Sequence, residues 1–348
     1  MCSDITIDIE SSKISQETIS RECENAYNLI NSLEHFKQCK AFGFNKSNDI
    51  WVLGSGFEIL VCEYQNETLR VEQVLQGHQS CVSNILYSNK EDMFFSVGSW
   101  DDNVIVWRRD QKRKWNKQYL NYKVDQTRDF EIIQLILNED EDELIGVMDY
   151  NFLIVWKKGL QNQWENSQVI SISKNELSQI LQVSYDKEFK KIITITLNGQ
   201  VQILSKNLQE QWKKQQSIYL KALKGKKFYN RDIDSLILQC QNAEFLLFHF
   251  NKENELYEEC HVKIPSSTKT QLYQFIESNF QTSQIQEIYA LQKEKQLQIL
   301  KMDERKQYQK IQTIQFEQNF FYQFTKNNQY LITWDYSKCL KIWKQKND

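Results

Sequence analysis

The chain has 348 residues and a net charge of −3, since 46 acidic residues nearly balance 43 basic residues. Hydrophobic residues make up 41% of the sequence and aromatic residues 13%, which provides for a large core and is typical of strand-rich proteins. The balanced charge argues against binding of nucleic acid or of an anionic membrane through a global basic field. A chain of this length exceeds one ordinary core and indicates two domains, a closed sheet or a repeat array.

The sequence favours a soluble protein of the cytoplasm. Its first residues, "MCSDITIDIE", are acidic and unlike a signal peptide, and no apolar run approaches the roughly 18 residues of a membrane span. Its eight cysteines form no C-x-x-C pair, which is typical of reduced thiols in the cytosol.

Two elements are predicted in the first 36 residues. Residues 5–9, "ITIDI", alternate apolar and polar side chains, so residues 1–10 are predicted to contain a strand. Residues 11–36 are predicted to form an amphipathic helix that packs on its own domain, with a partner-binding helix as the alternative. Its apolar positions recur at helical intervals: Ile19, Cys23, Ala26, Tyr27, Ile30 and Leu33.

From residue 37 onward the sequence repeats one pattern. The clearest copy, residues 98–115, reads "GSWDDNVIVWRRDQKRKW", in which Trp107 and Trp115 lie eight positions apart. Residues 152–164, "FLIVWKKGLQNQW", give the same spacing between Trp156 and Trp164. Weaker copies extend the series to seven marker positions at intervals of 43 to 52 residues: Val61, Trp107, Trp156, Leu204, Phe248, Leu300 and Trp343.

Each unit also carries further short apolar runs separated by polar turns. The third unit has "IIQLILN" and "ELIGVMD" before its marker, and the seventh has "FFYQFTKN" and "YLITWDY". With the marker strand and the strand that follows it, each unit supplies four short strands and no helix. The pattern therefore predicts an all-β chain of four-stranded antiparallel sheets that stack on one another.

The second unit resembles a WD40 repeat. Its "LQGHQSCVSNILYS" followed by "FFSVGSWDDNVIVW" has Gly77 and His78 as the GH pair, Asp101 in the turn between the second and third strands, and Trp107 at the end of the third strand. The resemblance implies a β-propeller of seven blades over residues 37–348, a single domain together with the N-terminal segment. It also implies structural roles for Gly77, His78, Asp101, Trp107, Trp156 and Trp343.

The chain departs from the family pattern at several positions. Tyr150 and Ser337 replace the turn aspartate in the third and seventh units, and Val97 stands where a strand-two Ser or Thr is usual. The seventh unit also ends after its third strand, so residues 1–10 are expected to supply its fourth strand and close the ring.

Two surfaces are candidates for binding. The resemblance implies a peptide-binding face over the channel mouth, where aromatic and arginine side chains concentrate binding energy; the expected residues are Trp100, Arg128, Asp129, Tyr150, Trp334 and Tyr336. The loop after the third strand of the second unit forms a basic patch for a possible anionic partner, made of Arg108, Arg109, Lys112, Arg113, Lys114 and Lys117.

The sequence offers no catalytic constellation. Its four histidines are widely separated, no G-x-S-x-G or phosphate-binding glycine loop is present, and the cysteines lack metal-ligand spacing. The acidic run at 138–143, "NEDEDE", is interpreted as a solvated turn. We therefore expect no catalytic residue, no metal and no cofactor.

The expected function is that of a non-enzymatic scaffold for protein–protein interaction. Its partners would be proteins or peptides, and the chain would be a monomeric subunit of a larger cytosolic assembly. Two alternatives are a targeting propeller of cytosolic iron–sulfur assembly and a substrate receptor of a ubiquitin ligase. A catalytic propeller with a polar channel is a weaker third.

Overall fold

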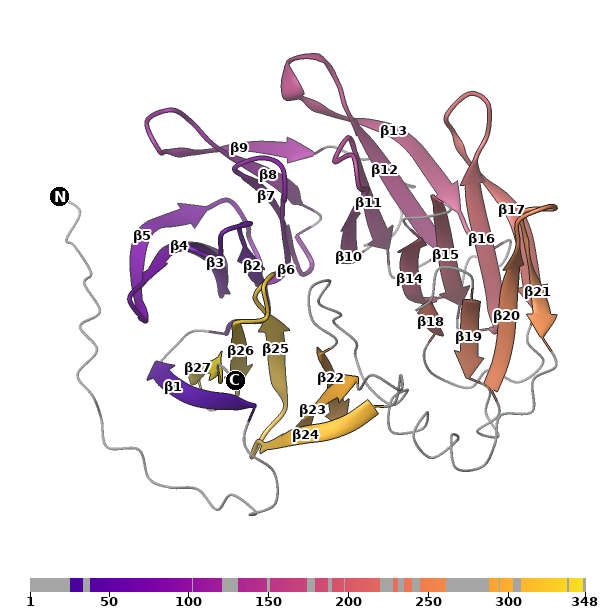
Figure 1. Ribbon diagram of the computed structural model, residues 1–348. Coiled ribbons are helices and arrows are strands. Elements are labelled where there is room, and N and C mark those ends of the chain that lie inside the picture. The colour runs from indigo at the N-terminus through magenta and orange to yellow at the C-terminus, as the bar shows by residue number, and fades with distance from the viewer. Residues whose placement is uncertain are drawn as a thin grey trace. The chain divides into compact units, whose positions relative to one another are not determined.

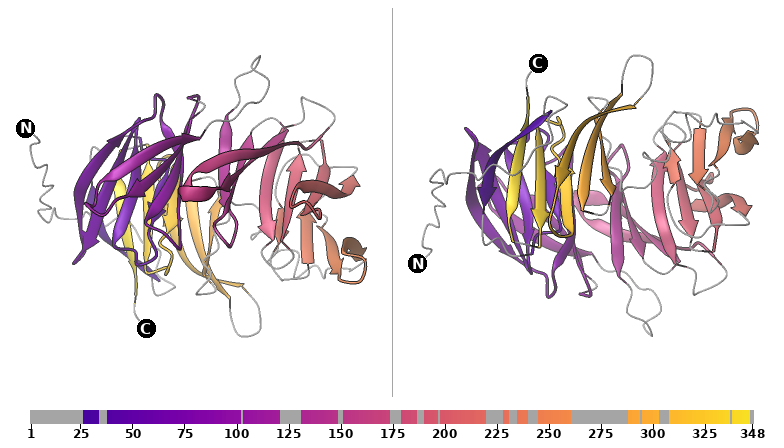
Figure 2. Two further views of the ribbon diagram at one scale, coloured as in Figure 1. Left: turned by 90° about the horizontal axis from the view of Figure 1, so that it is seen from above. Right: turned by 90° about the horizontal axis from the view of Figure 1, so that it is seen from below.

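The computed structural model describes most of the chain from residue 26 onward. The described residues are 26–33, 38–101, 103–120, 131–148, 151–173, 179–186, 190–196, 198–219, 228–230, 235–239, 245–260, 288–293, 295–302, 308–336 and 338–346. They form 27 strands in seven antiparallel sheets, six of four strands and one of three, with one short 3-10 helix at Leu160–Asn162 (Figure 1). The strands of each sheet lie side by side in every view (Figures 1 and 2). The prediction of an all-β chain is confirmed.

The chain divides into two compact units, each made of several sheets. The first comprises residues Met1–Gly98, Ile105–Gln118 and Ser278–Asp348, and the second comprises Ser99–Val104 and Tyr119–Glu277. Consecutive strands pair with each other throughout, except that β1 joins the last sheet beside β27.

The sheets of the first unit are as follows. One contains β2 (Phe42–Phe44), β3 (Ile50–Ser55), β4 (Glu58–Gln65) and β5 (Thr68–Gln76), and the next contains β6 (Val82–Tyr87), β7 (Met93–Gly98), β8 (Val104–Arg109) and β9 (Trp115–Leu120). The three-stranded sheet contains β22 (Ile288–Lys293), β23 (Gln296–Met302) and β24 (Tyr308–Gln315). The last contains β25 (Phe320–Phe324), β26 (Tyr330–Asp335), β27 (Leu340–Gln345) and β1 (Tyr27–Leu33).

The second unit holds three sheets. They contain β10 (Ile132–Leu137), β11 (Glu143–Met148), β12 (Phe152–Lys158) and β13 (Trp164–Ser171); β14 (Ile180–Asp186), β15 (Lys191–Thr196), β16 (Gln200–Lys206) and β17 (Trp212–Tyr219); and β18 (Phe228–Asn230), β19 (Ser235–Gln239), β20 (Phe245–Asn251) and β21 (Leu256–Cys260).

A β-bulge recurs between the last two strands of the sheets. In the β4–β5, β12–β13, β16–β17 and β23–β24 pairs, the last strand carries one extra residue opposite the same point of the strand before it. These are the third and fourth strands of four-stranded sheets, and β24, the last of the three described strands in its sheet, is counted with the fourth strands because it carries the same bulge. The register shifts at Val61/Cys62, Val155/Trp156, Ile203/Leu204 and Ile299/Leu300. Three of the predicted markers, Trp156, Leu204 and Leu300, therefore occupy the same structural position, directly after the register shift. In the first sheet this position is Cys62, one residue after the predicted marker Val61.

The β1 strand carries the same bulge and is therefore the fourth strand of the last sheet. On β27, Ile342 pairs with Asn31 and Trp343 pairs with Leu29, which leaves Ile30 as the extra residue. The prediction that an N-terminal strand completes the last sheet is confirmed, but the predicted segment is wrong. Residues 5–9 lie outside the described residues, and the edge of β27 that they were expected to fill is taken by β1.

The helix predicted over residues 11–36 is also wrong where the structure describes this segment, since residues 27–33 form a strand. The bulge explains the error. It reverses which face of the strand points inward, so Tyr27 packs in one hydrophobic cluster with β22–β26, whereas Ile30 and Leu33 pack in another with β2–β4. Apolar residues at intervals of three therefore imitate a helical stripe.

A glutamine on the fourth strand clamps three sheets to the next one. Just after the bulge, its side-chain amide donates a hydrogen bond to the backbone carbonyl of an aromatic residue on the neighbouring fourth strand, and its oxygen accepts from the backbone N–H of the same residue. The pairs are Gln168 with Trp212, Gln216 with Tyr257, and Gln312 with Tyr27, at 2.7 to 2.9 Å. Tyr27 thus occupies the position of Trp212 and Tyr257, which again identifies β1 as a fourth strand.

In the first unit, the turns after the first strands of three sheets meet. The backbone N–H of Lys326, in the β25–β26 turn, donates to Oδ1 of Asn48 in the β2–β3 turn at 2.9 Å. Its Nζ donates to the carbonyl of Ser88 in the β6–β7 turn at 3.1 Å and lies 5.5 Å from the ring centroid of Tyr87. The turns that follow the first strands of these three sheets therefore lie next to one another.

In the second unit, a buried carboxylate joins the β10–β13 sheet to the β14–β17 sheet. Glu143 is ion-paired with Lys157 at 3.2 Å and with Lys206 at 3.0 Å, and it accepts a hydrogen bond from Nε1 of Trp212. Burial lowers the pKa of Lys206, but its hydrogen bonds to Glu143 and Glu210 outweigh that effect and leave the pKa above its usual value. The two cations compensate the cost of burying Glu143.

The clamp to β1 can be tested with Gln312→Met, which keeps the side-chain length and removes both hydrogen bonds. Because Gln312 is buried and the backbone groups of Tyr27 would lose their partners, we expect the free energy of unfolding to fall by about 2 kcal/mol. Urea unfolding would measure the loss. Thr313→Ala, at an exposed position of the same strand, should change it by less than about 0.5 kcal/mol. Equal effects of the two substitutions would contradict the clamp.

Candidate functional site

The β6–β9 sheet contains a hydrogen-bonded network between the residues that resemble a WD40 repeat. Nε2 of His78 lies 2.7 Å from Oγ of Ser96, and Nε1 of Trp107 donates to the same oxygen at 2.8 Å. All three residues are buried. A Cβ on Gly77 would lie 2.8 Å from Cδ1 of Ile105, so glycine is needed beside the histidine. The expectation that Val97 takes the place of the strand-two serine is wrong by one residue, because Ser96 fills that role.

The same position of the second strand recurs in other sheets with different outcomes. Thr333 on β26 accepts a hydrogen bond from Nε1 of Trp343 at 3.0 Å, just as Ser96 does from Trp107. In the β14–β17 sheet the equivalent Thr194 is buried, but Leu204 stands at the marker position and has no N–H to donate. The hydroxyl of Thr194 accordingly has no hydrogen-bond partner in the structure.

In the β10–β13 sheet the position is Gly146. A Cβ there would lie 2.8 Å from Cζ3 of Trp156, so the glycine makes room for the marker ring. Trp107, Trp156 and Trp343 thus all contact the second strand of their own sheet. Asp101 accepts a hydrogen bond from the backbone N–H of Asn103 at 3.1 Å and so shapes the β7–β8 turn.

The two threonines should respond to the same substitution with opposite signs. Thr333→Val removes the acceptor of the Trp343 N–H, and we expect a loss of about 1 to 2 kcal/mol of stability. Thr194→Val removes a buried hydroxyl without a partner, so stability should stay unchanged or rise by up to about 1 kcal/mol. Chemical denaturation of both variants beside the wild type measures this. A similar loss in both would show that Thr194 has a partner.

Exposed aromatic side chains occupy the turn between the second and third strands in three sheets. Trp100, in the β7–β8 turn, is 74% exposed and has a φ of 63°. Phe57, in the β3–β4 turn, is 57% exposed, and Tyr336, in the β26–β27 turn, is 44% exposed. Phe57 was not predicted from the sequence, although it lies in the same kind of turn, within "SGF", as the other two.

The remaining residues of the predicted channel-mouth set do not extend this surface. Trp334 is only 2% exposed, so its prediction as a binding residue is wrong; it is a β26 core residue whose ring packs 5.2 Å from that of Tyr336. Phe321 lies 6.1 Å from Trp334, and the ammonium of Lys40 lies 5.7 Å from the Phe321 ring. Arg128, Asp129 and Tyr150 lie outside the described residues.

The predicted basic patch separates into a root and a tip. At the root, Arg108 is ion-paired with Glu91 at 3.8 Å, and Arg109 with Asp92 at 3.4 Å. Lys117 donates to the carbonyl of Gln76 on the neighbouring β5 at 3.0 Å. At the tip, three exposed bases follow one another: Lys112, Arg113 and Lys114.

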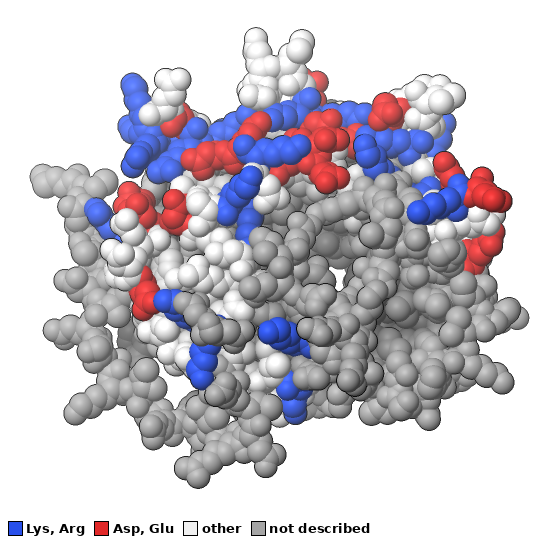
Figure 3. Space-filling model, viewed as in Figure 1, with Lys and Arg blue, Asp and Glu red and all other residues white. Residues whose placement is uncertain are grey.

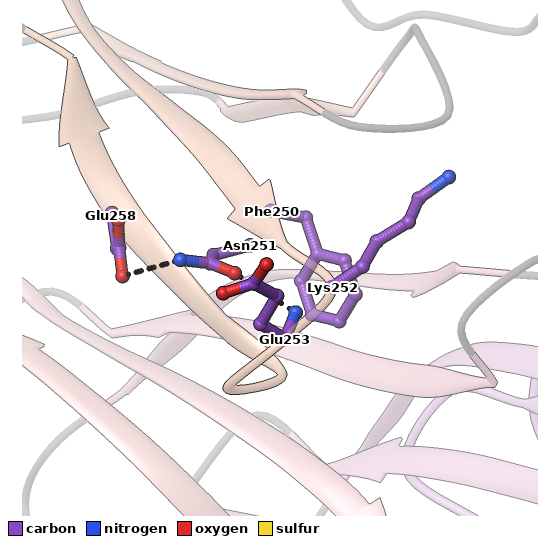
Figure 4. Close-up of a pocket in the computed structure, with 5 residues that line it drawn as sticks. All are labelled: Phe250, Asn251, Lys252, Glu253 and Glu258. Atoms are coloured by element: carbon purple, nitrogen blue, oxygen red, sulfur yellow. Dashed lines mark hydrogen bonds between the residues drawn. The ribbon is translucent and has the colours of Figure 1, made fainter.

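A shallow pocket of about 470 Å³ lies at the β20–β21 hairpin (Figure 4). Its polar lining is used within the hairpin: Nδ2 of Asn251 donates to Glu258 at 3.0 Å, and Nδ2 of Asn254 donates to the same oxygen at 2.6 Å. The Phe250 ring at its base lies 5.1 Å from the ammonium of Lys191. The arrangement holds the hairpin and brings together no acid–base pair aimed at a ligand.

Two of the described cysteines, Cys39 and Cys62, are buried, and burial raises the pKa of the Cys62 thiol to about 12, which makes it a poor nucleophile. Cys81 and Cys339 are partly exposed and free. Within the described ranges, no three His, Cys, Asp or Glu side chains are grouped so that they could hold a metal ion.

None of the described residues lies in a helix with the length and hydrophobicity needed to cross a membrane.

No protein-family model matches the sequence, and no curated protein matches it. Solved structures do match: 1412 chains share the fold, so the fold alone selects no activity. One is a crystal structure of a protein from Lactobacillus plantarum, a six-bladed β-propeller, with a TM-score of 0.58 and 9% identity. The match covers 80% of this chain and 85% of that chain. Together with the stacked four-stranded sheets, this likeness identifies the fold as β-propeller-like.

Proposed function

We propose that this chain is a non-enzymatic scaffold for protein–protein interaction, built as a WD40-type propeller of seven blades and acting in the cytoplasm as a monomeric subunit of a larger assembly. The observation that carries the proposal is Trp100. It is 74% exposed, so it contributes little to the core, and the turn presents it on the surface. Tryptophan is the residue type most enriched at the energetic centres of protein interfaces.

The backbone at Trp100 strengthens this interpretation. A φ of 63° lies in the left-handed region, which Asn, Asp and Gly adopt more readily than a bulky aromatic residue. The turn would be more stable with one of those residues. A strained and exposed tryptophan is therefore better explained by what it binds than by what it stabilises.

Two observations support the seven-bladed WD40 form. The described strands make seven sheets, and the fourth-strand bulge recurs in five of them, including the one completed by β1. The His78–Ser96–Trp107 network and the Thr333–Trp343 hydrogen bond are the contacts that the WD40 resemblance implies. The likeness to the six-bladed protein supports the propeller architecture. The proposed number of blades rests on the seven described sheets and the recurring bulge.

Trp100→Asn tests the binding role without disturbing the turn. Asparagine tolerates the left-handed conformation, so the melting temperature should stay unchanged or rise. If Trp100 anchors a partner, that partner should bind roughly 30-fold more weakly, which corresponds to the loss of about 2 kcal/mol at an interface centre. Quantitative affinity purification from the native cell, read by mass spectrometry, compares the variant with the wild type.

Tyr119→Thr is the matched control. It removes another exposed aromatic ring, 42% exposed on β9 and outside any second-to-third-strand turn. The set of bound proteins should be kept in this variant and lose specific members in Trp100→Asn. Identical sets in both variants and the wild type would contradict a binding role for Trp100.

A further inference from the structure

We propose that the tip of the β8–β9 hairpin, Lys112, Arg113 and Lys114, is a docking point for a carboxylate-rich segment of a partner protein. This inference rests on the proposed scaffold function and adds a second surface to it, together with the chemistry of the partner. The tip of the hairpin belongs to the first unit.

The side chains of the three tip bases are not needed to form the hairpin. Asp110 accepts hydrogen bonds from the backbone N–H groups of Lys112 and Lys114, at 2.8 and 2.9 Å, and so closes the turn through its side chain. The backbone N–H of Lys114 contributes most to holding the pKa of Asp110 below its usual range. The turn therefore uses the main chain at positions 112 and 114, and the basic side chains remain in solvent.

Two other hairpins close a loop of the same length without basic residues, and the 207–211 loop repeats the side-chain contacts of 110–114, since Oδ1 of Asn207 accepts from the backbone N–H groups of Gln209 and Gln211 at 3.0 and 2.9 Å. In each, the first residue of a five-residue loop donates its backbone N–H to the carbonyl of the fifth, at 2.7 to 2.9 Å. The fourth residue adopts a positive φ: 61° at Arg113, 63° at Asn162 and 56° at Glu210. The loops are 110–114, 159–163 and 207–211, and their last three residues read "KRK", "QNQ" and "QEQ".

The basic sequence is also the less favourable choice for this turn. Arginine adopts the left-handed conformation less readily than asparagine, which stands at the equivalent position 162. Three adjacent cations also repel one another. A tip sequence that costs stability and presents charge indicates selection for an anionic ligand.

The root of the hairpin adds further positive charge. Glu91 and Asp92 are ion-paired with the two root arginines through Nη1, whereas Nε and Nη2 of Arg108 and Nε of Arg109 are buried and are not offered to a ligand. Over residues 108–117, six bases oppose the single carboxylate of Asp110, which gives a net charge of +5. The hairpin therefore has more positive charge than its surroundings neutralise.

The extent of the patch favours an acidic peptide over a nucleic acid. A nucleic acid needs a positive track along its backbone, whereas here Glu91 and Asp92 lie directly at the root of the hairpin. On the face seen in Figure 3, acidic side chains lie next to basic ones along the band of described residues at the top of the view. A short run of carboxylates can contact the tip without meeting the acids at the root.

The direct test measures binding of a fluorescently labelled decaglutamate peptide to the full chain by anisotropy, at several salt concentrations. The variant K112Q/R113N/K114Q places glutamine where the matching 207–211 loop has Gln209 and Gln211, and asparagine at the position of positive φ, so it keeps the turn. Loss of three exposed charge pairs should weaken binding about tenfold. Binding to the wild type should also weaken as salt rises, because these charges are in solvent.

A charge-matched control separates the hairpin from net charge. K213Q/K214Q/K310Q removes three exposed lysines from β17 and β24 and should change the affinity less than twofold. Equal weakening by the two triple variants, or none in the tip variant, would overturn the proposal. Tighter binding of a single-stranded oligonucleotide than of the peptide would also overturn it, in favour of nucleic acid.

Two further measurements keep the outcome clear. The melting temperature of K112Q/R113N/K114Q should equal or exceed that of the wild type; if it falls, K112Q/K114Q, which retains Arg113, is used and should weaken binding about fivefold. Trp100→Asn should leave peptide binding unchanged. The two proposals can therefore be contradicted separately. Trp100→Asn can leave the set of bound proteins unchanged while the hairpin binds the peptide, or it can lose bound proteins while the hairpin does not bind the peptide.

Discussion

The glutamine that joins successive fourth strands is the interaction on which the described architecture depends. Packing of apolar faces holds neighbouring sheets together but does not fix their relative height, because a hydrophobic contact has no direction. Two hydrogen bonds from one amide to one backbone residue do fix it. The clamp occurs at Gln168, Gln216 and Gln312, always one position after a bulge that turns the side chain toward the next sheet.

Much of this fold could be predicted from the sequence, because period-two patterns and the marker spacing depend on local chain geometry. The errors arose where a bulge breaks that period. The bulge in β1 gave Tyr27, Ile30 and Leu33 the spacing of a helix, and a shift of one residue separated Val97 from Ser96 and Val61 from Cys62. A pattern of alternation cannot locate an extra residue that changes no composition.

The candidate surfaces were predictable to a lesser degree. Charge identified the basic hairpin, but only the structure separates the ion-paired Arg108 and Arg109 from the exposed tip. Their aromatic character led to the prediction that Trp334 and Trp100 belong to one binding surface. In the structure, Trp334 is buried and Trp100 is exposed. The turns that carry Trp100 and the basic tip lie outside the bulges, clamps and marker contacts, unlike the turns joined by Lys326. Side chains at these two turns can therefore change without changing how the sheets hold together.

The pairing of β1 with β27 has a consequence for how the protein folds during its synthesis. Residues near position 30 must wait for residues near position 342, so this contact spans almost the whole chain and forms only after its last strand has left the ribosome. Until then, the apolar side chains of β1 and the open hydrogen-bonding groups of the sheets stay accessible to other chains. During this interval, a chaperone that covers these exposed groups would be of most use to the growing polypeptide.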